Sequence, residues 1–159
     1  MADQEVHAAP TLTEMMRRRA ALTPDAPYFY LYGDTITYGR LWDVSGRYAA
    51  GLARGGLRAG DKLCLIYPTC AEFFFTFFGA LRIGVVPVPL YPTLGVEATA
   101  RILNDSETGA VATIGWFRKG VDESAAEPVP SAEADSLCST FAFPALTRWA
   151  NECRRSAAQ

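Results

Sequence analysis

The sequence predicts an α/β fold in which a mostly parallel sheet is flanked by helices. Three successive segments predict it: an apolar run at residues 63–67, an aromatic stretch with helical spacing at 73–81, and a valine-rich run at 85–88. A strand, a helix and a second strand form a βαβ unit, whose crossover is expected to be right-handed. The chain has 159 residues, of which 50% are hydrophobic and 20% are charged, so we expect one domain with a substantial core.

The residues before this unit predict a helix followed by a hairpin. Residues 11–14 have the Thr-x-x-Glu spacing of a capping box, and the helix that they begin is expected to end near Pro24. Residues 28–32 are predicted to form an aromatic strand. A turn at Gly33 and Asp34 then leads into a short returning arm at residues 35–37.

A longer helix is predicted from Tyr38 onward. Apolar residues recur with helical periodicity on one of its faces, at Leu41, Trp42, Tyr48, Ala49 and Leu52. Gly55 and Gly56 are expected to end the helix, because glycine is a poor helix former.

The aromatic helix of the βαβ unit is expected to begin with a second capping box, formed by Thr69 and Glu72. Its apolar face comprises Phe73, Phe74, Phe77, Phe78 and Leu81. We expect Phe77 and Leu81 to be buried under the sheet. Gly79 on the same helix is expected to allow a close neighbour, since it has no side chain.

Prolines indicate where the second strand of the unit lies in the sheet. Pro87 and Pro89 have no amide hydrogen to donate, so they are expected at a sheet edge or at the strand's end. Residues 96–105 predict a further helix, and residues 110–114 predict a further short strand.

The composition changes after these elements. Residues 122–135 are rich in Glu, Ala, Pro and Ser, which is typical of a linker. We therefore expect an α/β subdomain at residues 11–115 and a poorly ordered or loosely packed tail at residues 116–159.

Charge and spacing argue against several functional classes. The net charge of -2 gives no reason to expect nucleic acid as a partner, and the arginines at 17–19 are interpreted as a solvated helix face. The four cysteines lack metal-ligand spacing, and the single histidine, His7, has no partner for a catalytic triad. We therefore predict no metal ligand and no catalytic residue.

Hydropathy argues against a membrane-spanning segment. The apolar stretch at residues 73–90 is interrupted by Arg82 and by prolines, which favours a buried helix and strand. The N-terminal residues lack the basic start and apolar core of a signal peptide. We expect a cytoplasmic protein with reduced thiols.

Several motifs resemble those of the adenylate-forming (AMP-binding) superfamily. Residues 36–41, Ile-Thr-Tyr-Gly-Arg-Leu, resemble its first core motif, Leu-Thr-Tyr-x-Glu-Leu, although Arg40 stands where the family usually has Glu. Residues 81–89 resemble its second core motif, Leu-Lys-Ala-Gly-x-x-x-x-Pro. Residues 89–95 and 102–107 look most like the branch that activates fatty acids, the fatty acyl-CoA synthetases and fatty acyl-AMP ligases.

The resemblance covers residues 11 to about 114 and implies the N-terminal subdomain of such an enzyme, folded as a partial α/β sandwich. The complete enzymes bind ATP, Mg and a carboxylic acid, form an acyl-adenylate, and pass the acyl group to coenzyme A or a carrier-protein thiol. Their phosphate loop, a Ser/Thr/Gly-rich run ending in Pro-Lys, has no counterpart here, and their catalytic lysine lies beyond residue 159. We therefore expect no cofactor to be bound, and no fatty acid to be activated, by this chain alone.

Tyr91, Pro92 and Thr93 are the candidate substrate-binding residues. They follow the second strand of the βαβ unit, and ligands of open α/β sheets bind at the carboxyl ends of strands. The resemblance implies that they line the acyl or pantetheine tunnel of a complete enzyme. A purely structural role is the alternative.

The leading hypothesis is a truncated or split N-terminal segment of a fatty acid-activating ligase. Such a segment would bind the remainder of a split synthetase or self-associate. Two alternatives stay open: a stand-alone non-catalytic α/β module that binds an acyl group or a protein on the face of residues 73–78, and a flavodoxin-like nucleotide-binding protein. The residues do not specify the acyl chain length or the final acyl acceptor.

Overall fold

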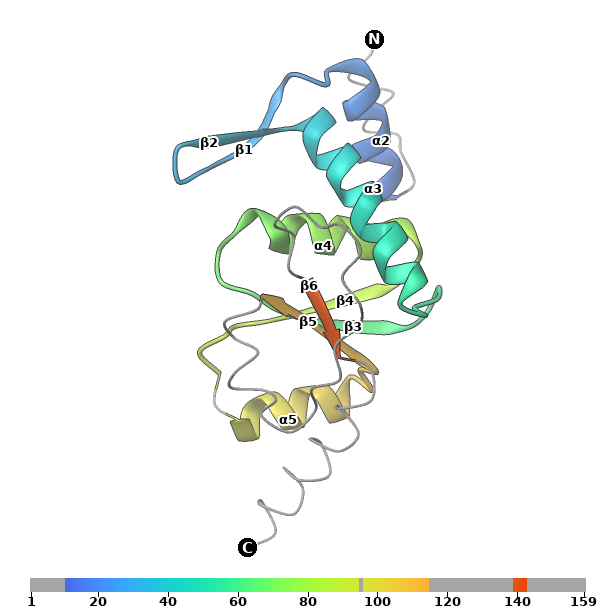
Figure 1. Cartoon of the computed structure of the whole chain (residues 1–159), viewed down its shortest axis with the longest axis vertical. Helices are drawn as coiled ribbons and strands as arrows, with labels where there is room; N and C mark the ends of the chain where they lie inside the picture. The colour runs from blue at the N-terminus through green and yellow to red at the C-terminus, as the bar shows by residue number, and fades with distance from the viewer. Residues whose placement is uncertain (1–10, 95, 115–138, 143–159) are drawn as a thin grey trace, which may run out of the picture. The chain divides into compact units, whose positions relative to one another are not determined.

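The computed structural model describes residues 11–94, 96–114 and 139–142 (Figure 1). The chain forms two compact units. The first, called the N-terminal unit, comprises Met1–Gly60 and Thr69–Val86. The second, called the sheet unit, comprises Asp61–Pro68 and Pro87–Gln159.

The described residues of the N-terminal unit form helices and a hairpin. In chain order these are α2 (Leu12–Leu22), β1 (Pro27–Leu31), β2 (Asp34–Thr37), α3 (Tyr38–Arg54) and α4 (Ala71–Arg82). As predicted, α2 begins after Thr11, whose hydroxyl accepts a hydrogen bond from the Glu14 amide at 3.1 Å. The start of α3 is similar, because the Thr37 hydroxyl accepts a hydrogen bond from the Arg40 amide at 3.2 Å.

The hairpin prediction is confirmed by the pairing of β1 with β2, but the turn lies one residue earlier than predicted, because Asp34 belongs to β2. The two strands are antiparallel, and Leu31 lies opposite Asp34, which leaves Tyr32 and Gly33 as a two-residue loop. Both loop residues have a positive φ, 50° at Tyr32 and 91° at Gly33. A type I′ turn requires this conformation at both central positions, and its twist matches that of the flanking strands.

The start of α4 differs from its prediction. The predicted capping box of Thr69 and Glu72 is wrong, because the residue before the helix is Cys70 and its side chain makes no capping hydrogen bond. With Ala71 as the first helical residue, Glu72 is the second. A capping-box carboxylate reaches back from the third position, so Glu72 is one residue too early.

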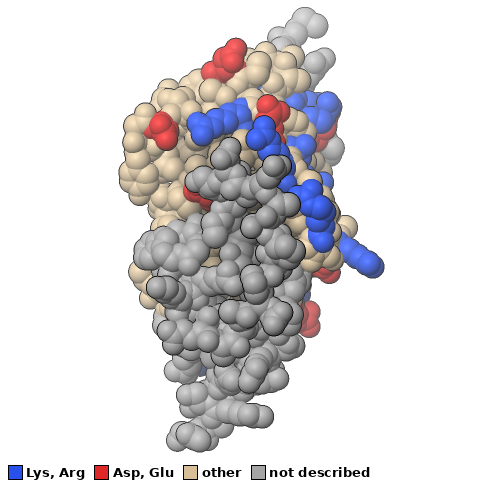
Figure 2. Space-filling view, in the orientation of Figure 1, with Lys and Arg blue, Asp and Glu red and all other residues tan. Residues whose placement is uncertain are grey.

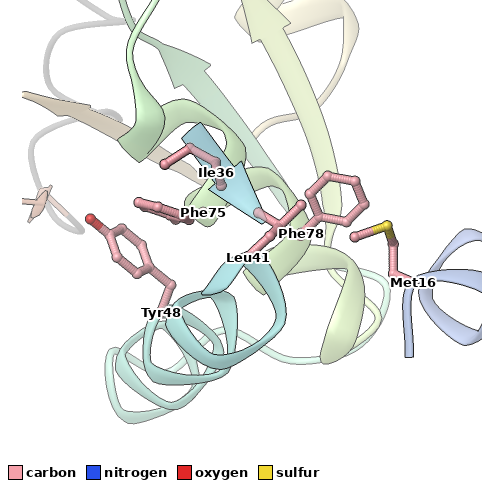
Figure 3. Packing of buried hydrophobic residues seen from close by; sticks show 6 residues of the cluster. All are labelled: Met16, Ile36, Leu41, Tyr48, Phe75 and Phe78. Atoms are coloured by element: carbon pink, nitrogen blue, oxygen red, sulfur yellow. The ribbon is translucent and has the colours of Figure 1, made fainter. Parts of the chain in front are cut away.

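The core of the N-terminal unit joins its helices to the hairpin (Figure 3). Its buried members are Met16, Ile36, Leu41, Tyr48, Phe75 and Phe78. The prediction that Phe77 and Leu81 are buried is wrong, since both are half-buried and pack against this cluster. The predicted close contact at Gly79 is confirmed, because an added Cβ would lie 2.9 Å from the Tyr48 Cβ and 3.0 Å from the Ser45 carbonyl oxygen.

The described residues of the sheet unit, with Val86 from the N-terminal unit, form a four-stranded sheet and a helix. The elements are β3 (Lys62–Ile66), β4 (Val86–Leu90), α5 (Val96–Asp105), β5 (Ala110–Ile114) and β6 (Ser139–Ala142). The strand order is β4-β3-β5-β6, with a parallel three-stranded part and an antiparallel β6. As predicted, the strand that contains Pro87 and Pro89 lies at a sheet edge.

The last strand lies within the tail that the sequence predicts to be poorly ordered or loosely packed. Residues 139–142 pair with β5, with Ala142 opposite Val111 and Ser139 opposite Ile114. The rest of the prediction for this tail falls on residues 116–138 and 143–159, which lie outside the described residues.

β3 is buried on both faces of the sheet. Leu63, Cys64 and Leu65 each have an exposed fraction of 0%, as is usual for a central parallel strand. On one face, Cys64 packs with Leu103 of α5 and Val111 of β5. Burial raises the pKa of the Cys64 thiol to about 12, so this thiol stays protonated and inert at neutral pH.

α5 ends at Asp105, as the sequence predicts. Beyond it, Glu107 has a φ of 52°, and the Thr108 amide donates a hydrogen bond to the Leu103 carbonyl at 3.1 Å. The Glu107 carboxylate also lies 3.0 Å from the Lys62 ammonium group of β3. Within the described ranges, no helix has both the length and the apolar character needed to cross a membrane.

Candidate functional site

The candidate site lies where the parallel strands of the sheet unit end. Tyr67 directly follows β3, Tyr91 directly follows β4, and β5 ends at Ile114. Parallel strands present their carboxyl ends at one edge of a sheet, and ligands of open α/β sheets bind there. The predicted residues Tyr91, Pro92 and Thr93 therefore form the first turn beyond this edge, between β4 and α5.

A tight turn holds these three residues. The Leu94 amide donates a hydrogen bond to the Tyr91 carbonyl at 3.1 Å, and the ring of Pro92 restricts φ within the turn. The Tyr91 side chain is 79% exposed, Thr93 is also exposed, and Pro92 is half-buried. The turn thus presents one phenol ring and one hydroxyl group to solvent.

The neighbouring strand ends are tied together by a polar contact. The Thr113 hydroxyl of β5 donates a hydrogen bond to the Ile66 carbonyl, the last of β3, at 2.7 Å. Tyr67 is only 5% exposed, so it belongs to the core rather than to the presented surface. The ends of β3 and β5 are therefore held together at this edge of the sheet.

The groups at this edge are suited to binding rather than to proton transfer. Tyr91 offers an aromatic face and a phenol, and Thr93 offers a hydroxyl that both donates and accepts hydrogen bonds. A ligand would meet stacking and hydrogen-bonding groups but no carboxylate, ammonium or imidazole from the three predicted residues. Among the described residues, no cluster of three or more His, Cys, Asp or Glu side chains is placed to hold a metal ion.

Sequence reasoning missed the contact that ties α4 to α3. The Arg82 guanidinium lies 3.7 Å from the centre of the Trp42 ring, and it donates hydrogen bonds to the Trp42 carbonyl and, at 3.3 Å, to the Ser45 hydroxyl. Burial lowers the pKa of Arg82, and the Asp43 carboxylate opposes this shift. The sequence signal that could have predicted this contact is Arg82 itself, the single charged residue in the apolar stretch at residues 73–90.

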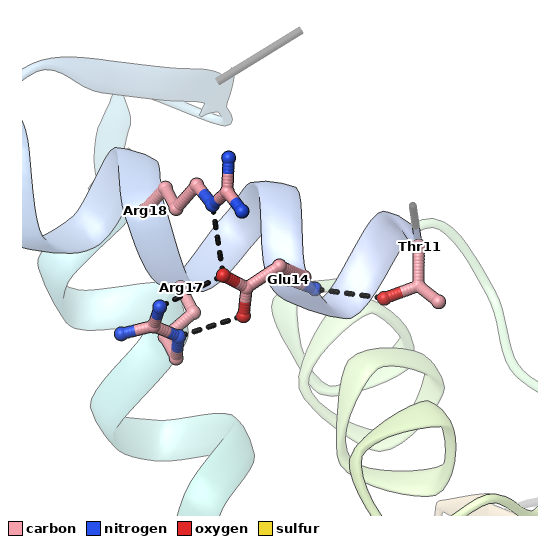
Figure 4. Close-up of polar contacts among 4 residues, drawn as sticks. All are labelled: Thr11, Glu14, Arg17 and Arg18. Carbon is pink, nitrogen blue, oxygen red and sulfur yellow. Dashed lines mark hydrogen bonds and ion pairs between the residues drawn. The ribbon is translucent and has the colours of Figure 1, made fainter. Parts of the chain in front are cut away.

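The arginines of α2 are partly paired rather than simply solvated (Figure 4). The Glu14 carboxylate accepts hydrogen bonds from Arg17 at 2.7 and 2.8 Å and from Arg18 at 2.8 Å. The hydrogen bonds from Arg17 and Arg18 lower the pKa of Glu14 to about 2. This network is local to one helix, since its members are three and four residues apart.

The stand-alone binding module would need an open aromatic face at residues 73–78. Phe75 and Phe78 are buried in the core of the N-terminal unit, and Phe74 and Phe77 pack against the same cluster. Much of this face is therefore occupied by the protein's own side chains.

Comparison with known proteins identifies the family of the chain. A family model described as AMP-binding enzyme matches residues 16–155. The chain belongs to this family. The match continues beyond residue 114, where the motifs recognised in the sequence end, so part of the tail is also related to the family.

Three relatives show how much of such enzymes the chain represents. A long-chain-fatty-acid–CoA ligase from Escherichia coli O6:H1 is 31% identical over 124 residues, which are 75% of this chain and 22% of the ligase. The fatty acid AMP ligase from Legionella pneumophila has a TM-score of 0.67 at 26% identity, over 74% of this chain and 22% of that protein. The O-succinylbenzoate coenzyme A synthetase from Bacillus subtilis, solved with ATP and magnesium, has a TM-score of 0.63 at 28% identity, over 66% and 29%.

These comparisons confirm the predicted α/β fold and the membership of the adenylate-forming superfamily. The chain spans about a fifth of the length of the curated fatty acid ligases that it matches. Its similarity to them lies in their N-terminal region.

Proposed function

We propose that these residues form the N-terminal part of an ATP-dependent ligase that activates fatty acids. In such a ligase the acid first becomes an acyl-adenylate and is then transferred to coenzyme A or to a carrier-protein thiol. The observation that supports the proposal is the match of 75% of this chain to a long-chain-fatty-acid–CoA ligase, together with the likeness to a fatty acid AMP ligase. A cytoplasmic location stays a prediction from the sequence.

We also propose that the 159-residue chain does not adenylate fatty acids by itself. Adenylation develops negative charge on the phosphates of ATP, and preorganised donors must stabilise it. The sequence contains no Ser/Thr/Gly-rich run ending in Pro-Lys, and the nearest stretch, Ser136 to Thr140, has neither glycine nor lysine. ATP, Mg and coenzyme A would therefore bind only where further residues complete the ligase.

Pyrophosphate release tests this inactivity. The purified chain is incubated with ATP, magnesium and palmitate, and a long-chain-fatty-acid–CoA ligase from Escherichia coli serves as the positive control. We expect release at the level of a blank without protein. Release that survives repurification, and is absent from a mock preparation, would show that the chain has its own phosphate-binding residues.

Within the complete ligase, Tyr91, Pro92 and Thr93 are proposed to line the path of the acyl group or of pantetheine. Their place beyond β4 and the exposure of Tyr91 support this role. Tyr32, which is 87% exposed in the hairpin loop, provides a matched control. In a ligase completed by the missing residues, Tyr91→Ala should raise the KM for palmitate or for coenzyme A, whereas Tyr32→Ala should leave both KM values unchanged. Unchanged KM values in Tyr91→Ala would assign these residues a structural role.

We further propose that the isolated chain self-associates, unless the remainder of a split ligase binds it. The support is the exposure of large hydrophobic side chains in and after β4, where Val86 is 47% and Tyr91 is 79% exposed. Light scattering and binding of a hydrophobic dye should both report association in freshly purified protein. A monomer that binds no dye would favour a self-contained module instead.

A further inference from the structure

Three exposed arginines of α3 lie on one side of the helix. Arg40, Arg47 and Arg54, called the arginine row, are spaced seven residues apart. Seven residues are nearly two helical turns, so the three Cα atoms fall within about 40° around the axis and about 10 Å apart along it. Figure 2 shows basic side chains gathered in a line on one flank of the molecule.

The charges of the arginine row are not neutralised within the described part of the chain. The printed ion pairs of the described residues join Arg17 and Arg18 to Glu14 and Lys62 to Glu107, and none of them includes a member of the row. Asp43 is exposed on the same side of the helix, three residues after Arg40 and four before Arg47, but the printed ion pairs of the described residues do not include it. The row therefore presents three positive charges, with one negative charge between the first two, along most of the 17-residue helix.

The surface beside the row carries small residues. Ala50 is exposed, and a Cβ added at Gly51 would meet open space. The large apolar residues of the helix are turned into the core, where Leu41 and Leu52 have an exposed fraction of 0%. A binding partner can therefore approach the backbone closely, but this face offers no bulky apolar side chain for insertion into a bilayer.

We propose that the arginine row docks an acidic helix of a partner protein. Two helices that lie side by side keep residues seven apart in register, so carboxylates at heptad spacing would meet all three arginines. Guanidinium groups bind carboxylates through two parallel hydrogen bonds, which gives such a contact geometric selectivity. The inference rests on α3 alone and does not depend on the ligase function.

A synthetic helix tests the spacing requirement. The probe is a labelled alanine- and glutamine-based helical peptide of about three heptads with one glutamate per heptad. A peptide of the same composition with its glutamates adjacent is the reference. By fluorescence anisotropy at low salt, we expect the chain to bind the heptad peptide roughly tenfold more tightly than the reference, and to lose this preference as salt screens the charges.

Two matched triple variants assign the binding to the row. R40Q/R47Q/R54Q should bind both peptides equally weakly, whereas R19Q/R58Q/R101Q removes the same charge elsewhere and should retain the preference. Circular dichroism melting of each variant shows that the fold is intact. Equal affinity of the wild-type chain for both peptides, or an unchanged preference in R40Q/R47Q/R54Q, would overturn the proposal. Binding to vesicles that contain phosphatidylglycerol, without binding to the heptad peptide, would also overturn it and assign the row to a lipid surface.

Discussion

The N-terminal unit is stabilised mainly by aromatic side chains of its helices and hairpin, whereas the described core of the sheet unit consists mainly of smaller apolar side chains of its strands and helix. In the first unit, the Tyr28 ring lies 5.8 Å from Phe78 and the Tyr48 ring lies 5.9 Å from Phe75. In the second, a packed cluster is formed by Cys64, Leu103 and Val111. Stability should therefore depend on a few large residues in the helical unit and on many small ones in the sheet unit.

The largest expected effect is the removal of a buried ring from the N-terminal unit. Phe78 is 5% exposed, so Phe78→Ala should lower the free energy of unfolding by about 3–5 kcal/mol. Phe77→Ala on the same helix should cost about 1–2 kcal/mol, because Phe77 is half-buried and loses less contact area. Urea denaturation of both variants measures the difference. Equal costs would mean that Phe77 is as important to the core as Phe78.

The contact between α3 and α4 can be tested with two helical glycines. Gly79→Ala should destabilise the protein by about 1–3 kcal/mol, since the new methyl group would press against the backbone of Ala49 and Ser45. Gly51→Ala, in α3, meets open space and should stabilise it by about 0.5–1 kcal/mol through helix propensity. Thermal melting shows both shifts. A stabilising Gly79→Ala would indicate a looser helix pair than the structure shows.

An effect of similar size is expected from one of the two described cysteines, of which each unit contains one. Cys64→Ser places a hydroxyl among apolar neighbours in the sheet unit and should cost about 1–3 kcal/mol. Cys70→Ser, at the residue before α4, should be neutral or stabilising by up to about 1 kcal/mol, because serine is a preferred N-cap and the thiol makes no capping bond. Denaturant titration separates the two outcomes. A costly Cys70→Ser would show that the thiol has a packing role.

The smallest effect is expected from the ion-pair network on α2. The pKa of Glu14 is lowered from 4.5 to about 2 by Arg17 and Arg18, so its contribution to stability is complete above pH 4.5 and is lost as the pH falls from 4.5 toward 2. Glu14→Gln should remove this part of the pH dependence of the melting temperature. If the melting temperature changes equally with pH in the wild-type protein and in Glu14→Gln between pH 4.5 and 2, the Glu14 network contributes nothing measurable to stability.

Much of the local structure follows from short stretches of sequence. Thr11 and Thr37 each cap the helix that follows them, and the hairpin turn includes Gly33, although it lies one residue earlier than predicted. Pro87 and Pro89 indicate an edge strand because neither has an amide hydrogen to donate to a neighbouring strand. These features were predictable because each depends on the conformational or hydrogen-bonding preference of a few adjacent residues.

The candidate site was only partly predictable. The place of Tyr91 beyond a strand follows from the βαβ pattern, but the exposure of Tyr91 and the burial of Tyr67 depend on neighbours that are distant in sequence. The tie between Thr113 and Ile66 likewise joins residues 47 positions apart. No local pattern encodes such a pair.

The sequence by itself determined the α/β class, the family, the turns and most element boundaries, because local preferences and periodicity act within one element. The tertiary structure alone decided which rings of α4 are buried, since this helix is apolar on nearly all sides and its periodicity does not single out one face. It also decided that Arg82 lies over Trp42 and that β6 pairs with β5. These choices depend on which distant surfaces meet and exclude water, and that is a property of the folded chain as a whole.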